Sequence, residues 1–145
     1  MKTLPLVATL ILATLAITPA ARAADAASLT VTFKGLTSKT GAVLFTVVNS
    51  EDAYNDKAKA VAQAMLPVNS DTVSQTFTGL APGRSAIKAF HDVNGDGKMN
   101  ANPFGMPTEP FAFSNNAIAN MGPPKWEAAA FEVKAGDNTQ SIDID

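Results

Sequence analysis

The stretch SAIKAFHDVNGDGKMN, residues 85–100, combines a strand with the loop in which the strand ends. In residues 85–90, neighbouring side chains alternate between two faces, as they do in a β-strand. From Asp92 onward, Asx residues and glycines take over, which is typical of a tight polar loop. The sequence therefore predicts an acidic loop that a strand holds at one end, and loops held in this way commonly carry binding sites.

The acidic loop has the spacing of a calcium-binding loop. Four side-chain oxygens stand at positions 1, 3, 5 and 9, and a glycine stands at position 6. Position 12 is Pro103 and not the closing Glu of an EF-hand, and no amphipathic helix flanks the loop. The alternative is a polar turn whose Asx side chains cap their own backbone. The predicted ligands of a Ca²⁺ cofactor are Asp92, Asn94, Asp96, the Lys98 carbonyl and Asn100, with Glu109 more distant.

Short alternating segments bounded by turn residues indicate an all-β fold. We expect a hairpin between the first two strands through residues 37–40, a helical turn at residues 51–58, and a turn at residues 136–138. About seven strands at this spacing predict an antiparallel β-sandwich. The expected strands are residues 28–34, 41–49, 60–68, 72–77, 85–90, 128–134 and 139–145.

Residues 101–126 form one long segment rich in Asn, Pro and Gly. Its aromatic residues argue against a disordered linker, so we expect an ordered loop that packs across one end of the domain. Two interpretations of its side chains stay open: they line a groove that binds a small molecule or glycan, or they pin the loop to the core. The candidate ligand-binding residues are His91, Glu109, Phe111, Phe113, Ser114, Asn115, Asn116 and Trp126.

His91 is the single histidine of the chain. Adjacent residues of a strand point to opposite faces, so His91 and Asp92 cannot easily form a catalytic dyad. There is no G-x-S-x-G motif, and Ser114 has no second histidine to serve it. We expect a structural His91 bonded to the long loop and no catalytic residue; a hydrolase that uses His91 is the remote alternative.

The first 23 residues have the features of a secretory signal peptide. Lys2 precedes an apolar run of about fourteen residues, which is shorter than the roughly twenty of a membrane span. Residues 21–23 end in a small-x-small pattern, so we expect cleavage near Ala23, a periplasmic or secreted location, and a single domain over residues 24–145.

Composition limits the partners. Removing residues 1–23 takes away Lys2 and Arg22 but no acidic residue, so the net charge moves from −2 to −4. An acidic chain without a basic cluster argues against a nucleic-acid partner, and no later segment predicts a membrane span. The absence of cysteine excludes thiol catalysis and disulfides. A protein or glycan partner of unknown identity remains.

Residues 77–90, FTGLAPGRSAIKAF, resemble a segment of prealbumin-like and carboxypeptidase-regulatory-like β-sandwiches, although Ser85 replaces the usual aromatic residue. Together with HDVNGDGKMN, PFGMPTEPFAFSNNA and GPPKWEAAAFEV, the chain resembles the exported bacterial family called domain of unknown function 2141. The resemblance covers nearly all of residues 24–145. It implies an immunoglobulin- or prealbumin-like sandwich that serves as an accessory or binding module.

The residues of the family pattern gather in the acidic loop and the long segment, where Asn100 and Trp126 depart from the preferred Asp and Phe. We therefore predict a non-enzymatic, exported module whose acidic loop binds calcium and braces residues 101–126. The residues that match are His91, Asp92, Asn94, Gly95, Gly97, Gly105, Pro107, Glu109, Phe113, Ser114, Asn115, Asn116, Gly122, Pro123 and Pro124.

Overall fold

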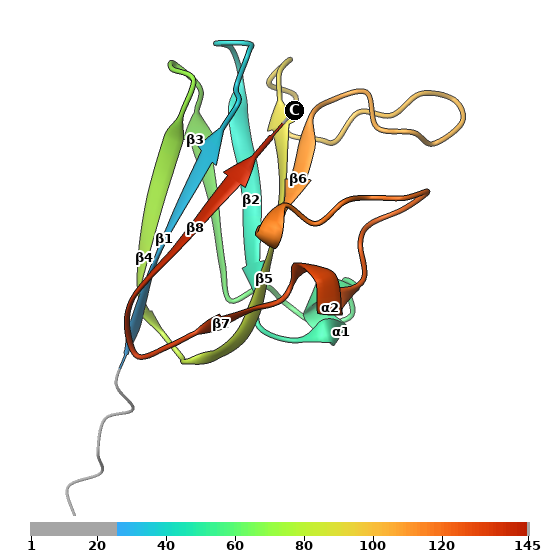
Figure 1. The fold of residues 1–145 in the computed structure, drawn as a ribbon. Helices are drawn as coiled ribbons and strands as arrows, with labels where there is room; N and C mark the ends of the chain where they lie inside the picture. Colours follow the sequence, from blue (N-terminus) through green and yellow to red (C-terminus); the bar gives the residue numbers. More distant parts are fainter. Residues whose placement is uncertain (1–25, 145) are drawn as a thin grey trace, which may run out of the picture.

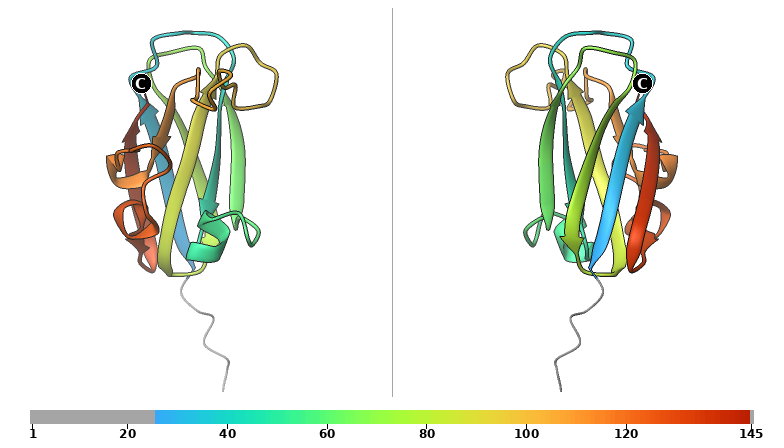
Figure 2. Two further views of the ribbon diagram at one scale, coloured as in Figure 1. Left: turned by 90° about the vertical axis from the view of Figure 1, so that its right-hand side faces the viewer. Right: turned by 90° about the vertical axis from the view of Figure 1, so that its left-hand side faces the viewer.

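The structure is a computed structural model that describes residues 26–144, so the predicted signal peptide lies outside the described residues. Two facing sheets form a β-sandwich, which confirms the predicted fold class (Figures 1 and 2). Sheet A has the order β4-β1-β8, and sheet B has the order β3-β2-β5-β6, with β7 paired to β5. The elements are β1 (Ala27–Lys34), β2 (Ala42–Val48), α1 (Glu51–Tyr54), β3 (Ala62–Pro67), β4 (Val73–Leu80), β5 (Gly83–Asp92), β6 (Phe111–Phe113), the 3-10 helix η1 (Ser114–Asn116), α2 (Trp126–Ala129), β7 (Phe131–Val133) and β8 (Gly136–Asp143).

The core lies between the sheets and follows from the alternation of the strands. In β1, every second side chain is buried, from Ala27 to Phe33. The ring of Phe33 meets the ring of Phe45 edge to face at 4.9 Å, and Phe45 meets Phe77 at 5.7 Å. These three rings join the two sheets, because β1 and β4 belong to sheet A and β2 belongs to sheet B. Aromatic pairs of this geometry stabilise a core beyond the area that they bury.

The predicted hairpin of the first two strands is wrong. β1 pairs with β4 and β8, whereas β2 pairs with β3 and β5. Residues 35–41 therefore cross from one sheet to the other. Both strands carry apolar residues that need a facing layer, and this crossing places the two apolar faces against each other across the core.

The last strand also differs from the prediction. Residues 136–138, expected to be a turn, are the first residues of β8. β8 runs parallel to β1 over its full length, from Ala27 opposite Gly136 to Lys34 opposite Asp143. The expectation of a purely antiparallel sandwich is thus wrong at this pair of strands. The alternation of β1 and β8 is the same for either direction, so the pattern could not distinguish them.

Residues 93–130 hold more regular structure than one loop. β6 lies in the middle and pairs with Lys88 to Phe90 of β5, and η1 follows it directly. The expected strand at residues 128–134 begins as α2 and becomes extended only in β7. Between these elements, two irregular segments project from the sandwich, residues 93–110 and residues 117–125 (Figure 1). We call them the first lobe and the second lobe.

Candidate functional site

The acidic loop folds around the carboxylate of Asp92. Asp92 is the last residue of β5, and its side chain is buried. Its Oδ1 accepts hydrogen bonds from the backbone N–H groups of Gly95 (2.8 Å) and Asp96 (3.1 Å), and its Oδ2 accepts one from Gly97 (2.7 Å). Both oxygens of the first predicted calcium ligand are therefore used by the turn itself.

The structure brings three other predicted ligands together. The amide nitrogen of Asn94 donates to Oδ1 of Asn100 (3.0 Å), and the amide nitrogen of Asn100 donates to Oδ2 of Asp96 (3.0 Å). The pKa of the Asp96 carboxyl is held below its ordinary value, first by this bond from Asn100 and then by the backbone N–H of Lys98. Hydrogen bonds to a carboxylate favour its charged form, so Asp96 stays ionised in the loop.

Glu109 ties the far end of the first lobe to the acidic loop. Its Oε1 accepts from the backbone N–H of Val93 (3.0 Å), and its Oε2 accepts from that of Asn100 (3.1 Å). The carboxylate is buried and spans the two ends of the loop. Among residues 26–144, no group of three or more His, Cys, Asp or Glu side chains is arranged to hold a metal ion. The geometry that is present is that of a brace made by hydrogen bonds.

His91 is sealed in the fold, with 2% of its surface exposed. Its Nε2 donates to the carbonyl of Thr40 at 2.8 Å, since a carbonyl can only accept. The prediction that the ring is bonded to the long segment is wrong. Its partner is Thr40, which lies in the crossing between β1 and β2. The long segment is bonded to the His91 backbone instead, whose N–H donates to the carbonyl of Pro110 (2.8 Å).

The polar side chains of η1 form hydrogen bonds with backbone groups of neighbouring segments. Ser114 Oγ is fully buried, accepts from the backbone N–H of Ile87 (2.8 Å) and donates to the carbonyl of Ala129 (2.5 Å). The amide nitrogen of Asn115 donates to the carbonyls on either side of Ala129. Asn116 accepts from the backbone N–H of Asp143 (2.9 Å) and thereby holds the edge of β8. These amides satisfy backbone groups that lack a partner strand.

Trp126 belongs to a second apolar cluster, at the end of the sandwich where α1 and α2 lie (Figure 1). Its ring meets that of Tyr54 at 5.8 Å, and the Arg84 guanidinium stacks on it at 5.5 Å. The Tyr54 hydroxyl donates to the carbonyl of Pro124 (2.8 Å), and burial raises the pKa of this hydroxyl to about 12. Trp126 is buried and is not among the residues that line the groove over sheet B, described next.

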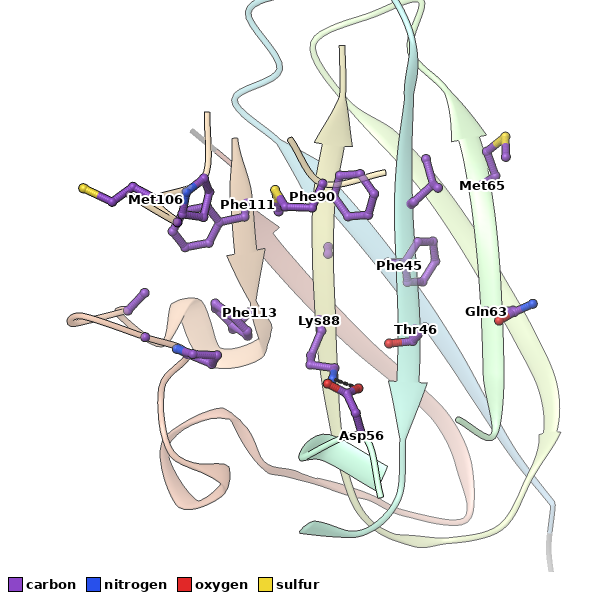
Figure 3. A pocket seen from close by; sticks show the side chains of 18 of the residues that line it. Phe45, Thr46, Asp56, Gln63, Met65, Lys88, Phe90, Met106, Phe111 and Phe113 are labelled. Atoms are coloured by element: carbon purple, nitrogen blue, oxygen red, sulfur yellow. Dashed lines mark hydrogen bonds and ion pairs between the residues drawn. The ribbon is translucent and has the colours of Figure 1, made fainter. Parts of the chain in front are cut away.

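A groove of about 1480 Å³ lies over the outer face of sheet B. Outward side chains of β2, β3, β5 and β6 form its floor, and the two lobes form its walls (Figure 3). Phe111 and Phe113, whose rings lie 6.1 Å apart, are the predicted ligand-binding residues that reach it. The other lining residues of the sheet are Leu44, Phe45, Thr46, Gln63, Ala64, Met65, Lys88, Ala89 and Phe90; Asp56 follows α1, and the lobes contribute Met99, Phe104, Gly105, Met106, Pro107, Ala119, Met121, Gly122 and Pro123.

Sequence reasoning missed most of these groove residues, although two signals pointed to them. β2 carries apolar residues on both faces, which indicates an outer face that is at least partly covered. Four of the five methionines of the chain, Met65, Met99, Met106 and Met121, line the groove. They come from four separate places in the sequence, so only the fold shows that they share one surface.

Comparison with known proteins places the chain in one family. The model of the family described as "Uncharacterized protein conserved in bacteria (DUF2141)" matches residues 31–141. The chain belongs to this family, which confirms the resemblance seen in the sequence. No curated protein and no solved structure matches the chain. Within residues 26–144, no helix combines the length and the apolar character needed to cross a membrane.

Proposed function

We propose that this member of the DUF2141 family is a non-enzymatic binding module, exported to the periplasm or the medium, that takes an apolar ligand in the groove of sheet B. One observation carries the proposal. Seven large apolar side chains remain exposed in residues 26–144, and five of them line the groove: Met65, Met99, Phe104, Met106 and Met121. Exposed apolar residues that gather in one place mark a binding surface, whereas scattered ones need no explanation.

The lining favours an apolar ligand over a glycan. A sugar site needs convergent polar groups to bind the hydroxyls, but Asn115 and Asn116 are used by the backbone and do not line the groove. The methionines suit an apolar ligand, because their flexible thioether side chains adapt to its shape. The volume exceeds the roughly 300–1,000 Å³ of sites for drug-sized molecules, so an extended ligand fits best.

Titration of residues 24–145 with the neutral fluorescent probe N-phenylnaphthylamine tests this function. We expect a saturable rise in probe fluorescence that Met65→Asp and Met106→Asp abolish, because each puts a charge on the groove surface. Both side chains are largely exposed, so the fold should tolerate the changes. Val61→Asp is the matched control, since Val61 is also exposed but does not line the groove. Unsaturable fluorescence, or full binding by both groove variants, would contradict the proposal.

A second candidate function is the binding of calcium by the acidic loop. The observation in its favour is that Asn94, Asp96 and Asn100 lie within hydrogen-bond distance of one another. Calcium would have to compete with the N–H groups that now occupy these oxygens. Thermal melts in millimolar calcium, with magnesium as the control, test it: an ion bound only by the native state raises the melting temperature. An unchanged melting temperature would contradict the calcium hypothesis.

A further inference from the structure

We infer that the ligand of the groove is a long-chain amphiphile with a carboxylate head, and that Lys88 binds the head; this inference rests on the proposed function. Lys88 is the one cation among the described residues that line the groove. It extends from β5 near one end of the floor, whereas Phe90, Phe111 and Met106 lie further along (Figure 3). Asp56, its ion-pair partner, is the one acidic residue of this lining. Once Asp56 is displaced, the Lys88 charge at one end of an otherwise apolar groove complements a molecule with one acidic end and an apolar tail.

The ammonium of Lys88 is held in place and recessed. It donates to the carbonyl of Tyr54 (2.8 Å) and lies over the Tyr54 ring at 5.6 Å. Only 23% of its side chain is exposed. A cation fixed in this way is preorganised, so less freedom is lost when an anion binds. Its recessed position suits a dissolved monomer that enters the groove, and not the flat surface of a lipid bilayer.

The present partner of Lys88 is easily displaced. Asp56 Oδ1 accepts from the ammonium at 2.5 Å, but the Asp56 side chain is 85% exposed. Water and salt reach the exposed Asp56 carboxylate and screen its attraction to Lys88. The acid group of a ligand arrives with an apolar tail that adds binding energy along the groove. The ligand carboxylate can therefore replace Asp56, which then turns to solvent.

This arrangement gives Lys88 and Asp56 opposite effects on binding. Lys88→Gln removes the attraction for the head and should weaken the binding of dodecanoate roughly ten-fold or more, as expected for a lost charge-assisted hydrogen bond. Asp56→Asn removes a competing anion and should tighten binding by at most about five-fold. Neither change should alter the affinity for the neutral dodecanol, which has the same tail.

The test measures displacement of N-phenylnaphthylamine by dodecanoate, dodecanol and dodecyltrimethylammonium from residues 24–145 and both variants. The two charged compounds are kept below their critical micelle concentrations, and dodecanol is kept below its solubility limit. The result expected is that dodecanoate binds most tightly and that only its affinity changes, in opposite directions. Equal binding of dodecanoate and dodecanol, or preference for the cation, would overturn the inference while the proposed function stands. If neither the probe nor any of the three binds, the proposed function itself fails.

A sedimentation assay with phosphatidylglycerol vesicles distinguishes the free acid from a lipid surface. We expect the protein to stay in the supernatant, because Lys88 lies too deep for a bilayer head group. Sedimentation with the vesicles that Lys88→Gln reduces, together with no displacement by dodecanoate, would show that the anion belongs to a membrane. That outcome also overturns the inference.

Discussion

Gly41 shows how one residue fixes the position of the acidic loop. Its φ of +70° lies in the left-handed region, and a Cβ built on it would stand 1.8 Å from the carbonyl oxygen of Asp92. Backbone cannot move aside as the end of a flexible side chain can. The close approach of these two segments therefore requires glycine.

Replacing Gly41 by alanine should destabilise the protein by at least about 2 kcal/mol, since strain at a positive φ adds to the collision with Asp92. The control is Gly79→Ala, at a φ of +74°, where an added methyl group would have no atom within 4 Å. It should cost about 1–2 kcal/mol, from backbone strain alone. Urea unfolding measures both variants, and equal losses would contradict the close contact.

Asp96 predicts a pH dependence at the scale of a single side chain. Its pKa is lower in the folded protein than in the unfolded chain, mainly because Asn100 donates to it. The unfolded state therefore binds more protons between the two pKa values, and stability rises with pH through that window. The contribution is fully present above the ordinary pKa of about 3.9 and is lost as the pH falls through the folded value.

Asp96→Asn should therefore lower the melting temperature near neutral pH and have a shrinking effect as the pH falls from about 5 to about 2. Thermal melts of the two proteins over this range measure the difference. A difference in melting temperature that stays constant across the range would show that the Asp96 charge has no role in holding the loop.

At the scale of the elements, the carboxylate of Glu109 holds the first lobe in place. Glu109 accepts from Val93 and Asn100, so it closes the acidic loop from outside while Asp92 closes it from inside. Glu109→Gln leaves only one acceptor oxygen for the two N–H groups. We expect these two amides to exchange hydrogen roughly ten- to a hundred-fold faster, because a buried bond worth about 1–3 kcal/mol is lost.

Hydrogen exchange followed by mass spectrometry or NMR measures this effect. Amides in the pairing of β2 and β5 should keep their protection, because the change is confined to the lobe. Glu132→Gln, on an exposed position of β7, is the matched control. Unchanged exchange at Val93 and Asn100 would mean that Glu109 does not brace the lobe.

Sequence patterns located most elements but not all of their ends. The alternation in residues 28–34 and 85–90 predicted β1 and β5 because one face of each is buried. Residues 136–138 were predicted to be a turn because Gly, Asp and Asn are typical turn residues. In the structure they belong to β8, because their pairing with β1 outweighs this local preference. Residues 126–129 form a helical turn that its contacts stabilise, since Trp126 packs on Tyr54 and Asn115 binds the Ala128 carbonyl.

At the scale of the whole molecule, the sequence predicted a sandwich but not which strands share a sheet. Strand alternation reports a buried face, and the same face can meet several partners. The two candidate sites also differ in how far the sequence could predict them. The acidic loop is contiguous and its residues could be named from spacing, whereas the groove joins residues from four strands and two lobes and depends on topology.

Coupling between Phe33 and Phe45 tests the sheet assignment directly. A double-mutant cycle with Phe33→Leu and Phe45→Leu should show a coupling of about 0.5–1.5 kcal/mol in the free energy of unfolding, because the rings touch across the core. Phe33 and Phe113 belong to separate clusters and should give additive effects. Additivity of Phe33 and Phe45 would contradict the facing arrangement of their strands.

The parallel pairing of β1 with β8 has a kinetic consequence. The first described strand cannot complete its sheet until residues 136–143, more than a hundred positions later, are available to it. Contacts so distant in sequence carry a high loop-closure cost and slow folding. During synthesis, a nascent chain would therefore be unable to close sheet A until residues 136–143 have left the ribosome.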